Sequence, residues 1–404
     1  MGDVPAFVRR HRFVRRGSVD APPFVIDVKG GEAAEQRMAA ERAAVLAILD
    51  EPGTARPLAA AARAWLDGDP DVTPLGAAGA LTALSIRIHY PENSADILTP
   101  LADLWIARHG LLFAAQAAVE QALLGVQEGE RVNPATYGDL SLAPVAFGEA
   151  AHRGPRGQIL LRVRAALAVT TEDEYAEVVE TLRPYRDRHW SAAVATSVLL
   201  PGERDWVEQD VRTVLANGSP KPELAALLLL AAGTAEQARA LAPHLDNWWS
   251  LPMPGVLATL ADGLGPGAAG AVLVWFDVPY MTAESQQRML SVLTDMDDDA
   301  VFAELLARID RKYVPAAVLE AAARFPARAM RMFAEAVRRC CAPTCSATST
   351  SWTRSCPRSA PPPRNGCVPW LPPLPPSRTR RPQPSRRCWR AHRGFIAPSP
   401  RNRS

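Results

Sequence analysis

Three residue types are missing from the last part of this 404-residue chain. Residues 336–404 contain no aspartate, glutamate or lysine, yet they hold 14 arginines, 14 prolines and all six cysteines. Residues 1–335 therefore have no cysteine, which excludes disulfides, iron–sulfur clusters and thiolate zinc sites from them. Because the 14 arginines supply +14 of a whole-chain charge of +2, residues 1–335 carry −12. That acidic balance excludes a general nucleic-acid binder.

Long apolar runs are also missing. The two longest, Leu224–Ala232 and Ala268–Phe276, fall well short of the roughly 20 residues that a membrane-spanning helix needs. Residues 9–16 contain five arginines, but Gly17 and Ser18 follow them in place of the apolar core of an export signal. The sequence therefore predicts a cytoplasmic protein with no membrane partner.

The abrupt change in composition indicates a shift of reading frame. Residues 340–357 read CCAPTCSATSTSWTRSCP. If the codons are assumed to be GC-rich and are read one base out of frame, this segment can be restored as LLRADVLRHLDLVDAVLP, in which leucines and valines recur at helical spacing with charged residues between them. We hypothesise that residues 340–404 are a frameshift product and that the chain is a truncated part of a larger protein.

In its present frame, the segment 340–404 is predicted to be a disordered tail rich in proline and arginine. Pro373–Arg378 matches a PxxPxR polyproline ligand, and the positive charge would suit a nucleic-acid-binding arm. The cysteines form no CxxC pair, so their spacing does not indicate a zinc site. The frameshift accounts for the missing carboxylates, the cysteines and the prolines together.

The periodicity of the preceding residues is helical nearly throughout. Phe302, Leu305, Leu306 and Ile309, for example, fall at i, i+3, i+4 and i+7 and give one apolar stripe. Capping boxes, which mark helix starts, occur at Thr171–Glu174 and Thr234–Gln237. The main candidate for a strand is Pro23–Val28.

The helix starts recur with a period of roughly 31 residues. One series lies near Thr171, Glu203, Thr234, Gly265, Asp297 and Pro326, and a second near Asp187, Ser219, Ser250, Thr282 and Tyr313. Two interleaved series indicate a repeated helix-turn-helix unit whose copies must stack to bury their apolar faces. We therefore predict an all-α fold, an α-solenoid of HEAT-like or armadillo-like repeats.

The predicted organisation has four parts. They are a basic, partly extended segment at 1–30, irregular helical repeats at 31–153, regular repeats at 154–339 and the tail at 340–404. Helices in the irregular part are expected near 32–50, 56–67, 74–89, 94–108 and 111–127.

Tryptophans are expected to serve as packing anchors. Trp105, Trp206 and Trp275 are interpreted as core or inter-repeat residues. Trp248 and Trp249 are adjacent, and two adjacent side chains cannot both face one core. This pair is the candidate interaction site.

Two local patterns resemble binding motifs without their structural context. Gly265–Gly270 spells GxGxxG, but the residues before it are helix-like and not a strand, so a turn between helices is favoured over a dinucleotide site. Asp295–Asp299 groups four carboxylates, yet it lacks the glycine and distal glutamate of a calcium loop. Acidic residues at this point are typical of a helix N-terminus.

No pattern predicts a catalytic, cofactor-binding or metal-binding residue. The histidines before the tail, which form no HxH or HxxxH pair, are interpreted as surface or loop residues. They are His11, His89, His109, His152, His189 and His244. A GxSxG elbow and a GxxxxGK loop are both absent from the sequence.

The stretch Phe302–Val314, continued by Leu319–Pro326, resembles a helical region of large actinobacterial proteins. Those proteins carry an uncharacterised domain of the molybdate-metabolism-regulator-like family. The resemblance implies that this chain is an N-terminal part of such a protein. It transfers no functional residue.

The sequence thus predicts a non-catalytic scaffold that binds protein partners over an extended helical surface and needs no cofactor. One alternative is a regulatory or enzymatic protein whose active domain is lost downstream of the frameshift. Another is nucleic-acid binding through the Arg-rich termini.

Overall fold

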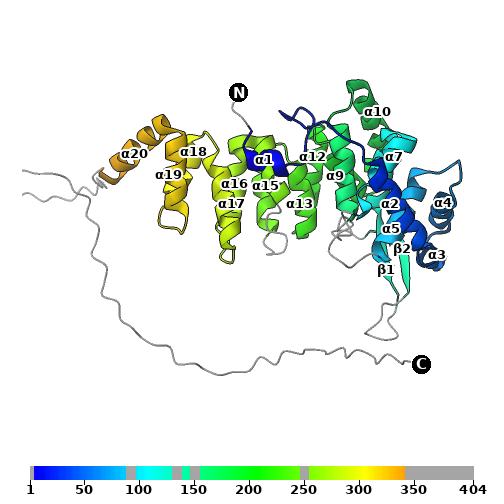
Figure 1. Cartoon of the computed structure of the whole chain (residues 1–404). Helices are drawn as coiled ribbons and strands as arrows, with labels where there is room; N and C mark the ends of the chain where they lie inside the picture. The colour runs from blue at the N-terminus through cyan, green and yellow to red at the C-terminus, as the bar shows by residue number, and fades with distance from the viewer. Residues whose placement is uncertain (1–3, 88–96, 130–138, 146–154, 246–253, 342–404) are drawn as a thin grey trace, which may run out of the picture. The chain divides into compact units, whose positions relative to one another are not determined.

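The computed structural model describes residues 4–87, 97–129, 139–145, 155–245 and 254–341. Met1–Ala342 form one compact unit. Helices make up nearly all of its described elements (Figure 1). The all-α class expected from the sequence is confirmed.

The first helices of the unit lie between Ala6 and Leu123. They are α1 (Ala6–His11), α2 (Val28–Ala40), α3 (Arg42–Asp50), α4 (Arg56–Asp67), α5 (Pro74–Arg87), α7 (Leu101–His109) and α8 (Leu111–Leu123). Helix α5 contacts α4 and α8, and α7 contacts α2 and α8. The single helix expected over 32–50 is two helices, because the backbone leaves the helical conformation at Glu41.

Two short strands follow α8. β1 (Leu124–Glu128) and β2 (Leu140–Pro144) pair antiparallel, with Gly125 opposite Ala143. The helix expected over 111–127 therefore ends at Leu123. The strand expected at Pro23–Val28 was wrong: the segment has no strand beside it, and Val28 already begins α2.

Helices also make up the second part of the unit as far as the structure describes it. They are α9 (Pro155–Leu167), α10 (Glu172–Leu182), η1 (Arg183–Asp187), α11 (Trp190–Leu199), α12 (Arg204–Ala216), α13 (Pro222–Ala231), α14 (Ala235–Leu241), η2 (Ala242–His244), α15 (Pro254–Leu264), η3 (Gly265–Ala268), α16 (Ala269–Phe276), α17 (Ala283–Thr294), α18 (Asp299–Leu306), α19 (Val314–Arg324) and α20 (Pro326–Cys341).

Alternate helices of this part contact each other. Each odd-numbered helix from α9 to α17 contacts the next odd-numbered one, ending with α19. In the even-numbered series α14 contacts α12 and α16, and α18 contacts α20. Figure 1 shows the helices following one another in this order. Stacked helix pairs of this kind are what a repeat array requires, while the HEAT-like or armadillo-like assignment stays a prediction.

Local sequence explains several helix starts. Both predicted capping boxes are present: the Thr171 hydroxyl accepts from the Glu174 N–H, the Thr234 hydroxyl accepts from the Gln237 N–H, and each partner side chain reaches back. Thr282 also caps its helix, α17. Each bond satisfies a backbone donor that has no partner within its helix.

The predicted tryptophan anchors lie in the core. The exposed fractions are 1% for Trp105, 9% for Trp206 and 0% for Trp275. The Trp275 Nε1–H donates to the Ala242 carbonyl at 2.9 Å, which ties α16 to η2. These rings therefore pack between neighbouring helices, as the sequence indicated.

Candidate functional site

Residues 12–27, here called the strap, cross the ends of helices that lie far away in the sequence. The strap follows α1, which packs on α15 (Figure 1). At its start the Phe13 N–H donates to Thr259 Oγ1 on α15 at 2.8 Å. At its end the Asp27 N–H donates to Asp103 Oδ2 on α7 at 3.1 Å. The strap therefore connects the two parts of the unit.

Arginines of the strap bind the C-terminal ends of helices. Arg15 donates to the Leu230 carbonyl at 2.9 Å and to the Ala232 carbonyl at 2.8 Å, at the end of α13. Arg16 donates to the Thr170 carbonyl at 2.8 Å, just after α9. The last carbonyls of a helix have no partner within it and carry the negative end of its dipole. The guanidinium groups supply both the missing donors and the complementary charge.

A buried ion pair fixes the first half of the strap. Arg12 pairs with Asp262 of α15, and their side chains are 1% and 8% exposed. Arg12 also donates to the carbonyls of Val19 and Asp20, at 2.5 and 2.8 Å. The Ser18 hydroxyl donates to the other Asp262 oxygen at 2.8 Å. Asp262 thus binds two residues of the strap, Arg12 and Ser18, and links both to α15.

Arg164 of α9 also binds the strap. It is fully buried and donates to the carbonyls of Phe13 and Val14 at 3.2 and 3.1 Å, and to that of Leu230 at 2.9 Å. Burial lowers its pKa well below the ordinary value, and the nearby Arg15 lowers it further. Burial likewise lowers the pKa of Arg15 to about 10. Guanidinium groups nevertheless stay charged at neutral pH, so this site concentrates buried positive charge.

The end of the strap is held by a second acid–base pair. Arg162 of α9 binds both oxygens of Asp103, at 2.8 and 3.0 Å, and the Asp103 side chain is 2% exposed. Arg162 also donates to the Val25 carbonyl at 2.5 Å and lies 4.1 Å from the centre of the Phe24 ring. One arginine therefore joins the strap, α7 and α9.

Sequence reasoning missed the role of these strap arginines. It counted the arginines of residues 9–16 only as a basic run. Their acceptors, such as Ala232 and Asp262, lie more than 200 residues away, so no local pattern could reveal them. Arg9 and Arg10 remain exposed.

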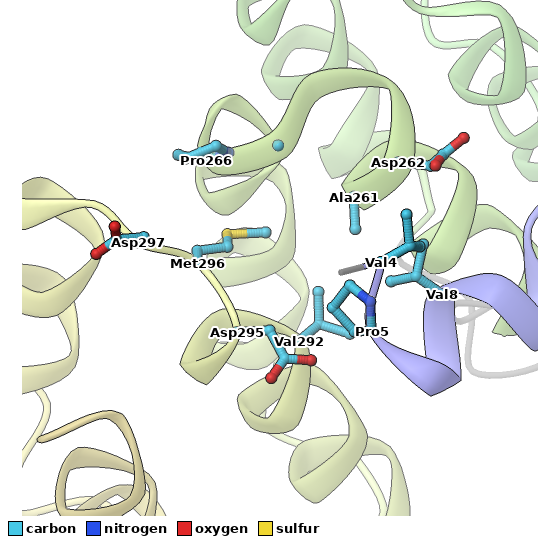
Figure 2. Close-up of a pocket in the computed structure, with 11 residues that line it drawn as sticks. Val4, Pro5, Val8, Ala261, Asp262, Pro266, Val292, Asp295, Met296 and Asp297 are labelled. Carbon is cyan, nitrogen blue, oxygen red and sulfur yellow. The ribbon is translucent and has the colours of Figure 1, made fainter. Parts of the chain in front are cut away.

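A cavity of about 400 Å³ opens where α1 meets α15 and α17. Its walls are mainly apolar (Figure 2): Val4, Pro5 and Val8 face Ala261 from one side, and Met296 extends from the loop after α17 toward Ala261 from the other. Val292 lies next to Pro5. Three carboxylates, which belong to Asp262, Asp295 and Asp297, stand around this apolar space.

Each of these carboxylates has an arginine partner. Asp262 points out of the cavity toward the strap and binds Arg12. Asp295 pairs with Arg324 of α19, and Asp297 pairs with Arg328 of α20. The cavity is therefore apolar, and its acidic rim is largely neutralised.

The remaining residues of the acidic cluster also have structural partners. Asp298 caps α18 by accepting from the N–H groups of Ala300 and Val301 at 2.8 and 3.0 Å, as expected for a helix N-terminus. Asp299 accepts from Arg328 and Arg331, at 2.8 and 2.6 Å. No group of three or more histidine, cysteine, aspartate or glutamate residues suited to a metal occurs within the described residues.

The glycine motif is a turn. Gly265–Ala268 form η3 between α15 and α16, so a helix precedes the motif and not a strand. Gly265 has a φ of +53°, a left-handed conformation that glycine adopts without strain. The interpretation as an inter-helix turn is confirmed.

The described histidines lie apart from one another. His189 caps α11: its Nδ1 accepts from the Ser191 N–H at 3.3 Å. His109 is exposed at the end of α7. Partial burial of the ring and the neighbouring Arg108 lower its pKa. His89 and His152 fall outside the described residues, as do Trp248 and Trp249, the predicted interaction pair.

One described helical stretch, Pro254–Phe276, is long and apolar enough by length and composition to cross a membrane. The sequence did not indicate it, because η3 joins two shorter apolar segments into one run. The structure buries 56% of its most apolar window. Its halves α15 and α16 contact α13, α14 and α17, so neighbouring helices provide the apolar surroundings.

Comparison with known proteins corrects the resemblance drawn from the sequence. A family model described as the YehI second domain matches residues 31–248. The resemblance to the molybdate-metabolism-regulator-like family was wrong, and the residues that carried it, Phe302–Pro326, lie outside the matched region. The comparisons with curated proteins and with solved structures gave no significant match. Since the matched region covers more than half of the chain, the chain belongs to the YehI second-domain family.

Proposed function

We propose that this protein is a non-catalytic scaffold that binds an extended segment of a partner protein across the ends of its stacked helices. The observation that supports the proposal is the strap itself. Residues 12–27 are held by backbone and side-chain contacts from α7, α9, α13 and α15 together. Many distributed contacts of this kind are how stacked helices bind extended chains without a signature motif.

The partner segment would enter the cavity between α1, α15 and α17. This cavity continues the line of helix ends that the strap follows, because α17 is the next odd-numbered helix after α15. Its apolar walls fit an aliphatic side chain. The charge of −12 on residues 1–335 favours association with a basic partner by electrostatic steering.

Selection of binding peptides from a random display library tests the proposal. We expect the selected peptides to share an aliphatic residue close to lysine or arginine. Affinity is measured by fluorescence anisotropy on the full chain and on Ala261→Trp, which fills the cavity from a partly exposed position on α15. Loss of the aliphatic contact should raise Kd at least about tenfold.

Ala33→Trp is the matched control, because Ala33 is exposed on α2, away from the cavity. It should leave Kd unchanged. Peptides that bind both tryptophan variants as tightly as the original chain would show that the cavity is not the binding site. A library that yields no binder would count against the scaffold proposal as a whole.

A further inference from the structure

The last two helices, α19 and α20, carry apolar side chains on their solvent side. Leu319 of α19 is 69% exposed, and Met330 and Val337 of α20 are 73% and 61% exposed. Exposed alanines flank them at spacings of three and four residues, which place all of them on one face of each helix: Ala316 and Ala323 on α19, and Ala327 and Ala334 on α20. Each helix therefore presents an apolar stripe, and we call the two stripes together the end face.

The other sides of the same two helices are packed against the array. Helix α19 contacts α17 and α18, and α20 contacts α18. Figure 1 shows α19 and α20 at one end of the row of helices. The terminal helices of a repeat array normally have a polar outer face, because that face meets water. The end face departs from this rule, and exposed apolar patches of this kind mark interaction sites.

Large and small side chains alternate along both stripes. On α19, Leu319 stands between two alanines, and the stripe of α20 reads, in order, Ala327, Met330, Ala334 and Val337. An alanine leaves room for a large side chain of a facing helix, which is how packed helices interdigitate. The large residues of the end face thus fit beside its own small ones. Such self-complementarity is what an interface between two identical chains related by a two-fold axis requires.

Charges of both signs stand beside the stripes. Glu320 of α19 is 56% exposed, and its ion pair with Arg324 is long, at 3.6 Å. Helix α20 carries the exposed Arg331 and Arg338 next to its own stripe. A purely acidic partner would meet Glu320, and a purely basic partner would meet the arginines. A second copy whose α20 faces α19 brings opposite charges together, and the two-fold axis repeats the contact.

We propose that the end face joins two copies of this chain in a symmetric dimer. The 16 residues of α20 extend over about 24 Å, and two adjacent helices are about 20 Å wide. The end face therefore covers about 500 Å² per chain, less than the roughly 800 Å² of a stable interface. The dimer is accordingly weak, with a Kd of about 10–100 µM. The proposal rests on α19 and α20 and is independent of the cavity.

Sedimentation of the full chain tests the proposal. Concentrations from about 1 µM to about 300 µM bracket the expected Kd, and reducing conditions keep the cysteines from linking chains covalently. The average mass should rise from that of a monomer toward that of a dimer. Leu319→Asp should raise Kd at least about tenfold, because it places a charge within the apolar stripe. Met330→Asp is the second variant, on the other helix of the end face.

Val169→Asp is the matched control, since Val169 is 46% exposed in the turn after α9. It should leave Kd unchanged. All three variants should keep the thermal unfolding midpoint of the original chain at low micromolar concentration, where the monomer predominates. A chain that stays monomeric at the highest concentration would overturn the proposal, because a different molecule would then cover the end face. Dimerisation that Leu319→Asp and Met330→Asp leave unchanged would overturn it as well.

A charge reversal tests the two-fold arrangement without touching the apolar stripes. Glu320→Arg leaves only positive charge on that side of α19, so it should weaken self-association several-fold. Arg338→Glu should weaken it in the same way. An equimolar mixture of the two variants should form a mixed dimer more tightly than either variant associates with itself, because opposite charges then face each other. A mixture that associates no more tightly than Glu320→Arg alone would overturn the proposed arrangement.

Discussion

The helices from α9 to α15 and the last two helices, α19 and α20, are held in place by different kinds of contact. From α9 to α15, the strap crosses the helix ends and its arginines satisfy the last carbonyls. At α19 and α20, an apolar face is left in solvent. The middle is thus held by contacts between residues far apart in the sequence, and the end has only its local neighbours. The free energy of unfolding should therefore depend strongly on single contacts of the strap. It should depend hardly at all on the exposed residues of α19 and α20.

The largest effect is expected from Asp262→Asn. This change leaves Arg12 buried without its carboxylate, close to the buried Arg15 and Arg164. Breaking a buried ion pair by removing one partner costs about 3–5 kcal/mol. Urea unfolding should show this loss. Glu172→Gln is the control, because Glu172 also pairs with a strap arginine but is 81% exposed. It should cost less than about 1 kcal/mol.

A smaller loss is expected from Arg15→Met. Methionine keeps most of the side-chain volume, but it leaves the carbonyls of Leu230 and Ala232 without this donor. The free energy of unfolding should fall by about 2 kcal/mol. Arg9→Met, in the exposed part of the same basic run, should change it by less than about 0.5 kcal/mol. Equal losses would mean that the strap arginines act only through their charge.

Thr171→Ala tests a purely local contact, the N-cap of α10. Losing this N-cap should lower the free energy of unfolding by about 1 kcal/mol. The loss should be the same when Asp262 is also changed, because the two sites share no partner.

The hydroxyls of Thr170 and Thr171 and the Thr171 N–H hold the pKa of Glu174 below its ordinary 4.5. The stabilisation from this carboxylate is therefore present above pH 4.5 and is lost as the pH falls below it.

An NMR titration of Glu174 checks the second half of this prediction. In Thr171→Ala its pKa should rise toward the ordinary value, because two of its hydrogen-bond donors are weakened or lost. An unchanged pKa would mean that the capping box contributes little in solution.

The smallest effect is expected at the exposed apolar residues of α19 and α20. Met330→Ser should change the free energy of unfolding by less than about 0.5 kcal/mol, because Met330 is 73% exposed. It should also reduce the binding of a fluorescent apolar dye. Leu293→Ser, at a 1% exposed position of α17, is the contrast and should cost about 3 kcal/mol or more. Similar costs at both positions would mean that Met330 is already covered in solution.

Much of the helical part could be predicted, because its signals are local. The bonds that start α10 and α14 join residues three positions apart, so Thr171 and Thr234 carry the information within their own neighbourhood. The turn at Gly265 is local in the same sense. The break at Glu41 and the strands after Leu123 were missed, because the surrounding residues are rich in alanine and leucine and suit a continuing helix equally well.

The candidate sites were harder to predict. Trp248 and Trp249 were selected for their adjacency and lie outside the described residues. The cavity combines Val8 near the N-terminus with Ala261 and Met296, and no sequence window contains all three. The acidic residues at 295–299 were recognised as structural, but their arginine partners on α19 and α20 were not.

By itself, the sequence determined the helical class, the start of helices such as α10 and α14, and the change of composition near residue 336. These properties depend on side-chain spacing, caps and residue frequencies, all of which are contained in short windows. Only the tertiary structure decided that the arginines of the strap bind helix ends and that the cavity opens beside α1. Those contacts join groups more than 150 residues apart, and folding alone brings such acceptors within reach of their donors.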